Sequence, residues 1–262
     1  MKNIVITGGS GMIGQRLTEL LTIKGYNVAW LSRTKDKKDK IPKFKWRPST
    51  REIEEKALED AHIIVHLAGA NIAKGRWTQQ QKQKIKDSRI QSAQLIFDKI
   101  KAKDTPLDAF ISASAIGYYG AITSEKIFSE EDRYDQNDFL SVVCHKWEQQ
   151  AKQFTDNLNI RSVCIRTGVV LSRESDLIKK AMLPTRFGLG APLGKGYQYV
   201  SWIHIDDLCH IYIKAIEDTA MRGVYNAVAP AETTNTAFMK TIATAMKKPF
   251  FLPPIAEWLF KL

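Results

Sequence analysis

The chain has 262 residues, of which 44% are hydrophobic and 26% are charged, as in ordinary globular proteins. This composition excludes wholesale disorder and a coiled coil, and no apolar run reaches the ~18 residues that a membrane-spanning helix needs. The formal net charge of +11 fits either an anionic partner such as nucleic acid or simply a basic surface.

The basic residues are densest between residues 33 and 47, and no nucleic-acid-binding motif accompanies them. We therefore disfavour a nucleic-acid partner. Three widely spaced cysteines, Cys144, Cys164 and Cys209, include no C-x-x-C pair, which excludes a disulfide framework and a recognisable zinc site. The apolar run before the first glycine-rich turn is only three residues long, Ile4-Val5-Ile6, too short for the apolar core of a signal peptide. We expect a cytoplasmic protein that does not use a metal.

Short β-branched segments alternate with helical patterns in the first two thirds of the chain, which is typical of β-α-β units and a parallel sheet. Strands are predicted at residues 3–7, 27–32, 62–67, 109–112 and 161–167, and helices at 14–24, 51–59, 78–101 and 140–156. Their nearly continuous apolar runs indicate strands covered on both faces by helices.

The remaining third begins with a Gly- and Pro-rich segment, 172–200, which predicts a loop with at most a short helix. The elements predicted after it are a strand at 199–205, a helix opening near Asp206 or Asp207, a strand at 223–228 and a helix at 235–246. We predict an α/β fold, a doubly wound parallel sheet with a small C-terminal lobe. Residues 1–171 would form the sheet domain, with 203–228 packing back on it, and 172–202 and 229–262 the lobe on the substrate side.

A glycine-rich turn lies between the first predicted strand and the first helix. Its residues are Thr7, Gly8, Gly9, Ser10, Gly11, Met12, Ile13 and Gly14. Glycines here allow positive φ and let the backbone approach a pyrophosphate, whose charge the helix N-terminus favours. A P-loop is excluded because Gln15-Arg16 replaces the required Lys-Ser/Thr. The turn predicts dinucleotide binding, and a merely tight turn is the alternative.

The end of the second strand decides between the two nicotinamide dinucleotides. An acidic residue there would bind the ribose hydroxyls of NAD, but the chain has Ser32 and Arg33. Arg33 can pair with a 2′-phosphate in forked geometry, and Ser32 can add a hydrogen bond. We therefore predict NADP(H). If Arg33 is only solvated, Asp36 is the residue that would support NAD instead.

Several segments resemble the extended short-chain dehydrogenase/reductase superfamily, which contains UDP-galactose epimerase. The matching segments are 7–14, 65–69, 112–120, 166–168 and 202–208. The sequence motifs at 70–77, 114–120, 144–148 and 194–207 resemble those of an atypical branch named "epimerase family protein", sometimes labelled cell-division inhibitor. Members of that branch usually continue a few dozen residues further, so the resemblance implies a chain shortened at its C-terminus.

The resemblance implies roles for individual residues. Leu67, Ala68 and Gly69 would pass beside the adenosine half of the cofactor. Arg166, Thr167 and Gly168 would border its nicotinamide end. Ser114 matches the catalytic serine, which hydrogen-bonds the substrate oxygen.

The chain departs from the superfamily at its Y-x-x-x-K pair. Alignment on Glu148 places Leu140 and Cys144 at those positions, and none of the eight tyrosines has Lys four residues later. The pair matters because an ordinary tyrosine, with a pKa of about 10, exchanges protons poorly at neutral pH. Tyr118 and Tyr119 are the candidate substitutes, and a packed aromatic loop is their alternative role.

Four further residues are candidates for contact with the substrate. They are Arg76, Arg89, Cys144 and Trp202. The arginines would hold a phosphate or carboxylate, or else lie on the surface as ordinary cations. For Cys144 the favoured alternative is a small buried apolar residue, and Trp202 fits core packing as well as it fits closing the pocket.

Two functions from different classes fit these observations. One is an NADP(H)-binding oxidoreductase or epimerase-like enzyme that transfers hydride on an unidentified carbonyl or hydroxyl compound, with a nucleotide sugar as the inherited guess. The other is a non-catalytic NADP(H)-binding sensor or regulatory module. We expect a small-molecule partner, no membrane association, and allow for a homodimer.

Overall fold

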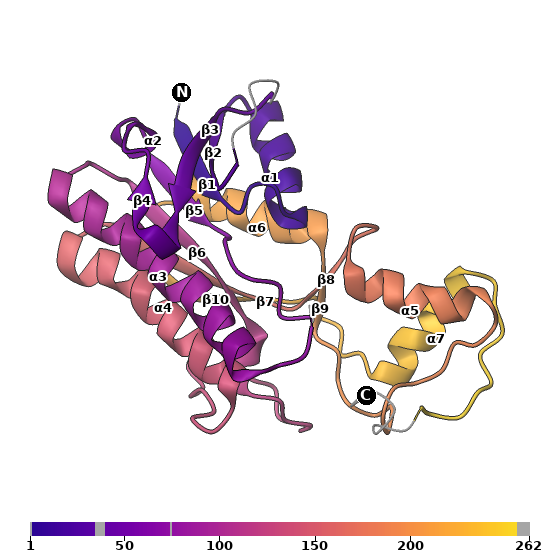
Figure 1. Cartoon of the computed structure of the whole chain (residues 1–262). Coiled ribbons are helices and arrows are strands. Elements are labelled where there is room, and N and C mark those ends of the chain that lie inside the picture. Colours follow the sequence, from indigo (N-terminus) through magenta and orange to yellow (C-terminus); the bar gives the residue numbers. More distant parts are fainter. Residues whose placement is uncertain (1, 35–39, 74, 256–262) are drawn as a thin grey trace.

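The computed structural model describes residues 2–34, 40–73 and 75–255 (Figure 1). Within them, the main sheet has the strand order β10-β7-β6-β5-β1-β2-β3-β4. The strands are β1 (Asn3–Thr7), β2 (Asn27–Ser32), β3 (Lys43–Arg47), β4 (Glu52–Ile53), β5 (Ile63–His66), β6 (Ala109–Ala115), β7 (Arg161–Thr167) and β10 (Gly223–Ala227). All neighbours pair in parallel except β3 with β4. The predicted doubly wound α/β fold is confirmed.

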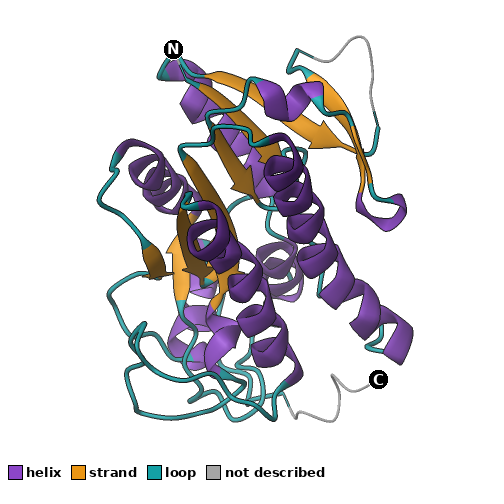
Figure 2. Ribbon diagram, turned by 90° about the vertical axis from the view of Figure 1, so that its left-hand side faces the viewer, coloured by secondary structure: helices purple, strands orange, loops and turns teal. Residues whose placement is uncertain are grey.

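Helices cover both faces of this sheet (Figure 2). One face packs against α1 (Met12–Ile23) and α6 (Ile205–Glu217), and the other against α3 (Gln79–Lys103) and α4 (Phe139–Leu158). The central strands are apolar toward both sides, and Ile4, Ile6, Ile63 and Ile64 are completely buried. The two apolar clusters are therefore separated by the sheet, as the continuous apolar runs predict.

The strand order reverses between β1 and β5, which pair directly. In an open α/β sheet this reversal leaves a crevice beyond the carboxyl ends of the strands, where ligands bind. The glycine-rich turn follows β1 at this edge.

Residues 43–59 differ from the prediction of a helix at 51–59. Strands β3 and β4 form an antiparallel pair at the sheet edge, and α2 is only Lys56–Glu59. The pattern Lys-Phe-Lys-Trp-Arg in β3 alternates like a strand, and Trp46 is buried beneath it. The basic charges of this segment concealed its period of two.

The segment 172–200 contains more helix than predicted. Helix α5 runs over Asp176–Arg186 and includes Pro184 near its end. Helix α6 begins at Ile205, and its N-cap is His204, whose Nδ1 accepts a hydrogen bond from the backbone N–H of Asp206 at 3.3 Å. The prediction of a start at Asp206 or Asp207 was therefore too late, because a histidine ring satisfies the helix end.

A smaller lobe contains α5 and α7 (Asn235–Ala245) and lies to one side of the sheet (Figure 1). A short parallel pair, β8 (Val169–Leu171) and β9 (Trp202–His204), lies next to it. The segments that connect sheet and lobe bond to one another, through Val169 N to Ser201 O (2.8 Å), Ala229 N to Trp202 O (2.6 Å) and Val200 N to Thr233 O (2.8 Å). The division into domains at 171, 202 and 228 stays a prediction.

Candidate functional site

The glycine-rich turn is shaped by steric constraints on three of its glycines. Gly8 has φ +71°, which side chains rarely adopt. A Cβ on Gly14 would lie 2.5 Å from Gly8 O, and a Cβ on Gly9 would strike the ring of Trp30. The backbone therefore turns from β1 into α1 in a space that side chains would fill.

The outer side of the same turn is open. Ser10 and Gly11 are exposed, and Gly11 is the N-cap of α1 without a side-chain cap. The first N–H groups of a helix have no partner within it, and the helix dipole makes this end attractive to anions. At the end of β2, Ser32 accepts a hydrogen bond from Thr34 N at 3.3 Å, and the neighbouring Arg33 is exposed. This edge can hold an anionic dinucleotide.

A buried histidine joins the ends of β1 and β5. His66 Nδ1 lies 2.8 Å from Thr7 Oγ1, and His66 Nε2 lies 3.1 Å from Ser92 Oγ. Ser92 donates to Ser88 O at 2.7 Å, so Nε2–H of His66 donates to Ser92, and Thr7 donates to Nδ1. Complete burial lowers the pKa of His66 to about 4. We call Thr7, His66 and Ser92 the histidine cluster; it is neutral at pH 7.

The segment after β5 presses against the glycine-rich turn. Thr7 Oγ1 accepts a hydrogen bond from Ala68 N at 3.1 Å, and a Cβ on Gly8 would lie 3.0 Å from the backbone of Leu67 and Ala68. Gly69 is exposed and approaches Arg89, since a Cβ there would lie 3.0 Å from Arg89 Cζ. Two of the predicted cofactor segments, after β1 and after β5, are thus in direct contact.

Strand register places three polar residues in one row. Ser114 of β6 pairs with Arg166 of β7, and Arg166 pairs with Asn226 of β10. Neighbours in register on parallel strands point to the same face of a sheet. This row lies near the carboxyl ends of its strands.

An ion pair between Arg166 of this row and Glu148 of α4 links the row to that helix. Arg166 Nε and Nη2 bind the two oxygens of Glu148, each at 2.8 Å, and Ser114 Oγ donates to Glu148 Oε1 at 2.6 Å. Arg166 is 2% exposed and Glu148 10%. Burial acts to lower the pKa of Arg166, but Glu148 more than offsets this and the pKa is raised. We call Ser114, Glu148 and Arg166 the charged cluster.

The two candidate tyrosines pack around this ion pair. The Arg166 guanidinium lies 3.4 Å from the ring centre of Tyr118, and Arg166 Nη1 donates to Tyr119 OH at 2.9 Å. Tyr119 in turn donates to Asn226 Oδ1 at 2.7 Å. Burial raises the pKa of both tyrosines. Both rings are therefore neutral phenols at pH 7.

The four substrate candidates are not all brought together. Arg89 lies over the ring of Trp147 at 5.1 Å, and its Nη1 donates to Ile85 O at 3.0 Å and Ala70 O at 3.2 Å. Burial lowers the pKa of Arg89 and raises that of the nearby Cys144 to about 12, so the thiol is protonated.

The other two candidates lie elsewhere. Arg76 is exposed in the segment before α3. Trp202 is half-buried at the start of β9 and donates to Thr233 Oγ1 at 3.2 Å. The contact of any of the four with a substrate stays a prediction.

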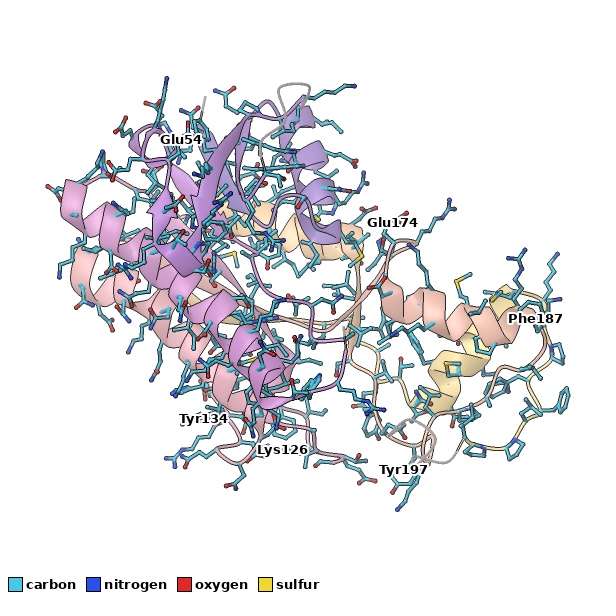
Figure 3. The ribbon with its side chains drawn as sticks, in the orientation of Figure 1. Glu54, Lys126, Tyr134, Glu174, Phe187 and Tyr197 are labelled. Atoms are coloured by element: carbon cyan, nitrogen blue, oxygen red, sulfur yellow. The ribbon has the colours of Figure 1, made fainter. Side chains whose placement is uncertain are left out.

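A cleft of about 1050 Å³ lies between the sheet and the lobe. Tyr119 and Asn226 line one part of it, and α5 and α7 contribute Leu177 and Phe238. Figure 3 labels Lys126 on the loop below α4, and Phe187 and Tyr197 on the lobe across from it. The cleft joins the end of the polar row to the lobe.

Comparison with known proteins places this arrangement in a family. Residues 4–227 match the model of the NAD dependent epimerase/dehydratase family. The chain is 35% identical over 252 residues to the epimerase family protein YfhF of Bacillus subtilis, covering 96% of this chain and 82% of that protein. The chain belongs to the NAD dependent epimerase/dehydratase family. The resemblance inferred from its motifs is confirmed.

Solved structures of epimerase family members agree. The human epimerase family protein SDR39U1 (isoform 2), crystallised with NADPH, is 31% identical with a TM-score of 0.83, over 96% of this chain and 82% of that one. The nucleoside-diphosphate sugar epimerase of Corynebacterium glutamicum is 32% identical with a TM-score of 0.77, over 99% of this chain and 54% of that one.

Sequence reasoning underestimated three residues of this epimerase family site. From the sequence, Glu148 fits a salt bridge better than a place facing the site, and no motif in the sequence singles out His66 or Asn226 as site residues. His66 ends a buried strand directly before Leu67, and Asn226 lies near the end of the last predicted strand. Polar residues at carboxyl ends of parallel strands are a usable signal. The hydrogen-bond partners of Glu148, His66 and Asn226 lie on other strands and helices, so only the folded arrangement shows them.

Two further observations concern the described residues. No helix among them is long and apolar enough to cross a membrane. In the same part of the chain, no group of three or more His, Cys, Asp or Glu side chains is placed to hold a metal ion.

Proposed function

We propose that this epimerase family protein binds NADP(H) and transfers hydride on a small carbonyl or hydroxyl compound. The observation that carries the proposal is the open, uncapped glycine-rich turn with Arg33 exposed at the end of the next strand. The NADPH found with human SDR39U1, a relative of 31% identity, supports the same cofactor.

The residues present fit this cofactor. Residues 7–14 would hold the pyrophosphate at the N-terminus of α1, and Ser32 and Arg33 the 2′-phosphate. Leu67, Ala68 and Gly69 would border the adenosine half, and residues 166–168 the nicotinamide end. When bound, NADP(H) supplies a hydride donor or acceptor.

Ser114 would orient the reacting oxygen of the substrate. Its hydroxyl proton already points to Glu148 Oε1, so a lone pair on Ser114 Oγ is available to accept a hydrogen bond from a substrate hydroxyl. Arg166 fixes Glu148 through two hydrogen bonds and thereby fixes Ser114. Tyr118 and Tyr119, as neutral phenols, would serve as proton donors rather than acceptors.

A non-catalytic NADP(H) sensor is the second candidate, and one observation favours it. Leu140 and Cys144 occupy the places of the superfamily's tyrosine and lysine, and the hydroxyl of Tyr119 is already bonded to Asn226. A module of this kind would bind the cofactor without turnover.

Cofactor choice is tested by titrating the purified chain with NADPH and NADH in thermal-shift measurements. We expect tighter binding of NADPH, and Arg33→Ala should weaken it by about 10- to 100-fold, because a charge-assisted hydrogen bond contributes ~1.5–3 kcal/mol. Arg47→Ala, an exposed cation at the far end of the same basic run, is the control. Equal losses in both variants would contradict the role of Arg33.

Turnover is tested by NADPH oxidation over a panel of carbonyl compounds. Under the enzyme proposal, Ser114→Ala abolishes most of the rate, while Ser112→Ala in the same strand keeps it, because Ser112 only donates to Ala113 O at 2.9 Å. Tight NADPH binding with no turnover across the panel would favour the sensor. Absence of binding to either dinucleotide would overturn both.

A further inference from the structure

The cleft between sheet and lobe has walls that are unusual for a basic protein. Several of its large apolar side chains are far from buried: Ile122, Ile127, Leu177, Leu189 and Tyr199 are 57%, 78%, 47%, 56% and 44% exposed. Folded proteins rarely leave such side chains uncovered together, and when they do the surface is usually a binding site. Small-molecule sites are mostly apolar hollows with a few polar groups.

The charges on these walls have the wrong sign for a phosphorylated ligand. Although the chain carries a net charge of +11, the described residues that line the cleft include two lysines, three carboxylates and no arginine. One of the lysines, Lys126, is paired with Asp132. The carboxylates are Glu125, Asp176 and Glu232.

A nucleotide sugar would place its diphosphate in this environment. Recognition of phosphate groups relies on Arg forks, Lys ammonium groups or helix N-termini, which offset the loss of hydration. The N-termini of α5 and α7 do border the cleft, but Asp176 lies in the first turn of α5 and Glu232 lies just before α7, so each of these ends already has a carboxylate beside it. With no arginine among the described lining residues, much of the diphosphate charge would stay unpaired. An uncharged ligand has no such cost, and the exposed apolar walls would gain by covering it.

Two uncharged polar side chains lie at the end of the cleft that meets the polar row. Tyr119 and Asn226 line it there, and Asn226 is two strands from Ser114 in the same register row. A ligand with one hydroxyl or carbonyl group could bind there through that group, and its apolar body would cover the exposed apolar side chains of the walls. We propose that the cleft binds a neutral, mainly apolar carbonyl compound or alcohol, in place of a nucleotide sugar. The inference rests on the proposed function for its reaction, but the binding step can be measured without it.

Binding is tested with the full chain and the neutral apolar dye Nile red. The dye should fluoresce on binding, 4-phenyl-2-butanone should displace it, and UDP-glucose should not displace it at millimolar concentration. Displacement by UDP-glucose, or its tighter binding than the ketone, would overturn the inference.

Two variants on the same helix locate the dye. Leu177→Arg should weaken Nile red and ketone binding at least fivefold, because it puts a charge on the cleft wall. Leu183→Arg, on α5 at a position 63% exposed and outside the cleft lining, should leave both unchanged. Equal effects of the two variants would show binding to the general surface and would overturn the inference.

NADPH affinity, measured in parallel, separates the two proposals. Leu177→Arg should leave it unchanged. If the chain fails to bind NADPH but Leu177→Arg still removes ketone binding, the proposed function fails and the apolar cleft stands. If NADPH binds and UDP-glucose displaces the dye, the apolar-cleft inference fails and the proposed function stands.

Discussion

The two buried polar clusters lie at the carboxyl ends of neighbouring strands of one sheet, and they differ in charge. In the histidine cluster, hydroxyl groups satisfy a neutral ring but cannot offset the desolvation of an imidazolium, and the pKa of His66 falls to about 4. In the charged cluster, the two hydrogen bonds that Arg166 donates to the Glu148 carboxylate keep Arg166 ionised at 2% exposure. Burial therefore selects the neutral form where partners are hydroxyls, and the ion pair where a carboxylate fits the guanidinium.

The largest expected effect comes from breaking the ion pair. Glu148→Gln leaves the Arg166 charge buried and unpaired, so we expect a loss of about 3–5 kcal/mol in the free energy of unfolding. Urea unfolding measures it. Glu52→Gln, whose ion pair with Lys45 is 3.0 Å long but about half exposed, should lose less than about 1 kcal/mol.

A double variant distinguishes the unpaired charge from lost packing. Glu148→Gln combined with Arg166→Met removes both charges and should recover much of the stability. A double variant as unstable as the single one would show that the charge of Arg166 is not what makes the single variant unstable.

The histidine cluster should reveal its neutral state in the pH dependence of stability. The folded pKa of His66 is lowered from 6.5 to about 4, so the unfolded chain binds more protons between these values. Its contribution is complete above pH 6.5 and is lost as pH falls toward 4, by about 3 kcal/mol in total. Urea unfolding of the wild-type chain and of His66→Gln across this range measures the difference, and parallel slopes would contradict it.

The smallest of the three effects concerns the turn above the histidine cluster. In Gly14→Ala, the Cβ would lie 2.5 Å from Gly8 O and 2.6 Å from Gly9 Cα, which are backbone atoms that cannot swing away. We expect a loss of about 1–3 kcal/mol in the free energy of unfolding, together with weaker NADPH binding. In Gly11→Ser, a Cβ would lie 3.3 Å from Gly8 O, which requires only a small shift, so this variant should lose much less stability, and an equal loss would contradict the steric explanation.

The sequence predicted the glycine-rich turn better than the charged cluster for a physical reason. Glycines at Gly8, Gly9 and Gly14 form one local turn, so their spacing carries the geometry. The partners of the charged cluster come from β6, α4 and β7, and Glu148 is 34 positions from Ser114 and 18 from Arg166 in the chain. Their pairing depends on strand register, which one sequence does not specify. The residue types at 114, 148 and 166 were visible, but their contacts were not.

The fold was also unevenly predictable. The alternation of buried strands and helices up to Thr167 followed from continuous apolar runs. Strand β3 was missed because lysines and arginine alternate with its aromatic residues, and α5 is longer than the short helix expected in a segment rich in glycine and proline. In both segments the residue composition indicated a loop more strongly than the hydrophobic periodicity indicated a strand or a helix.

The bonded connections between sheet and lobe also affect any motion of the lobe. Val169, Val200 and Ala229 lie on the three chain segments that connect the sheet with the lobe, and each donates a backbone hydrogen bond to another of these segments. A rotation of the lobe would therefore have to move all three connecting segments together. Gly168 lies in this seam, where a Cβ would lie 2.7 Å from Ser201 O. A larger residue at position 168 would push the segment of Ser201 away, so the lack of a side chain on Gly168 sets the distance between two connecting segments at the base of the cleft.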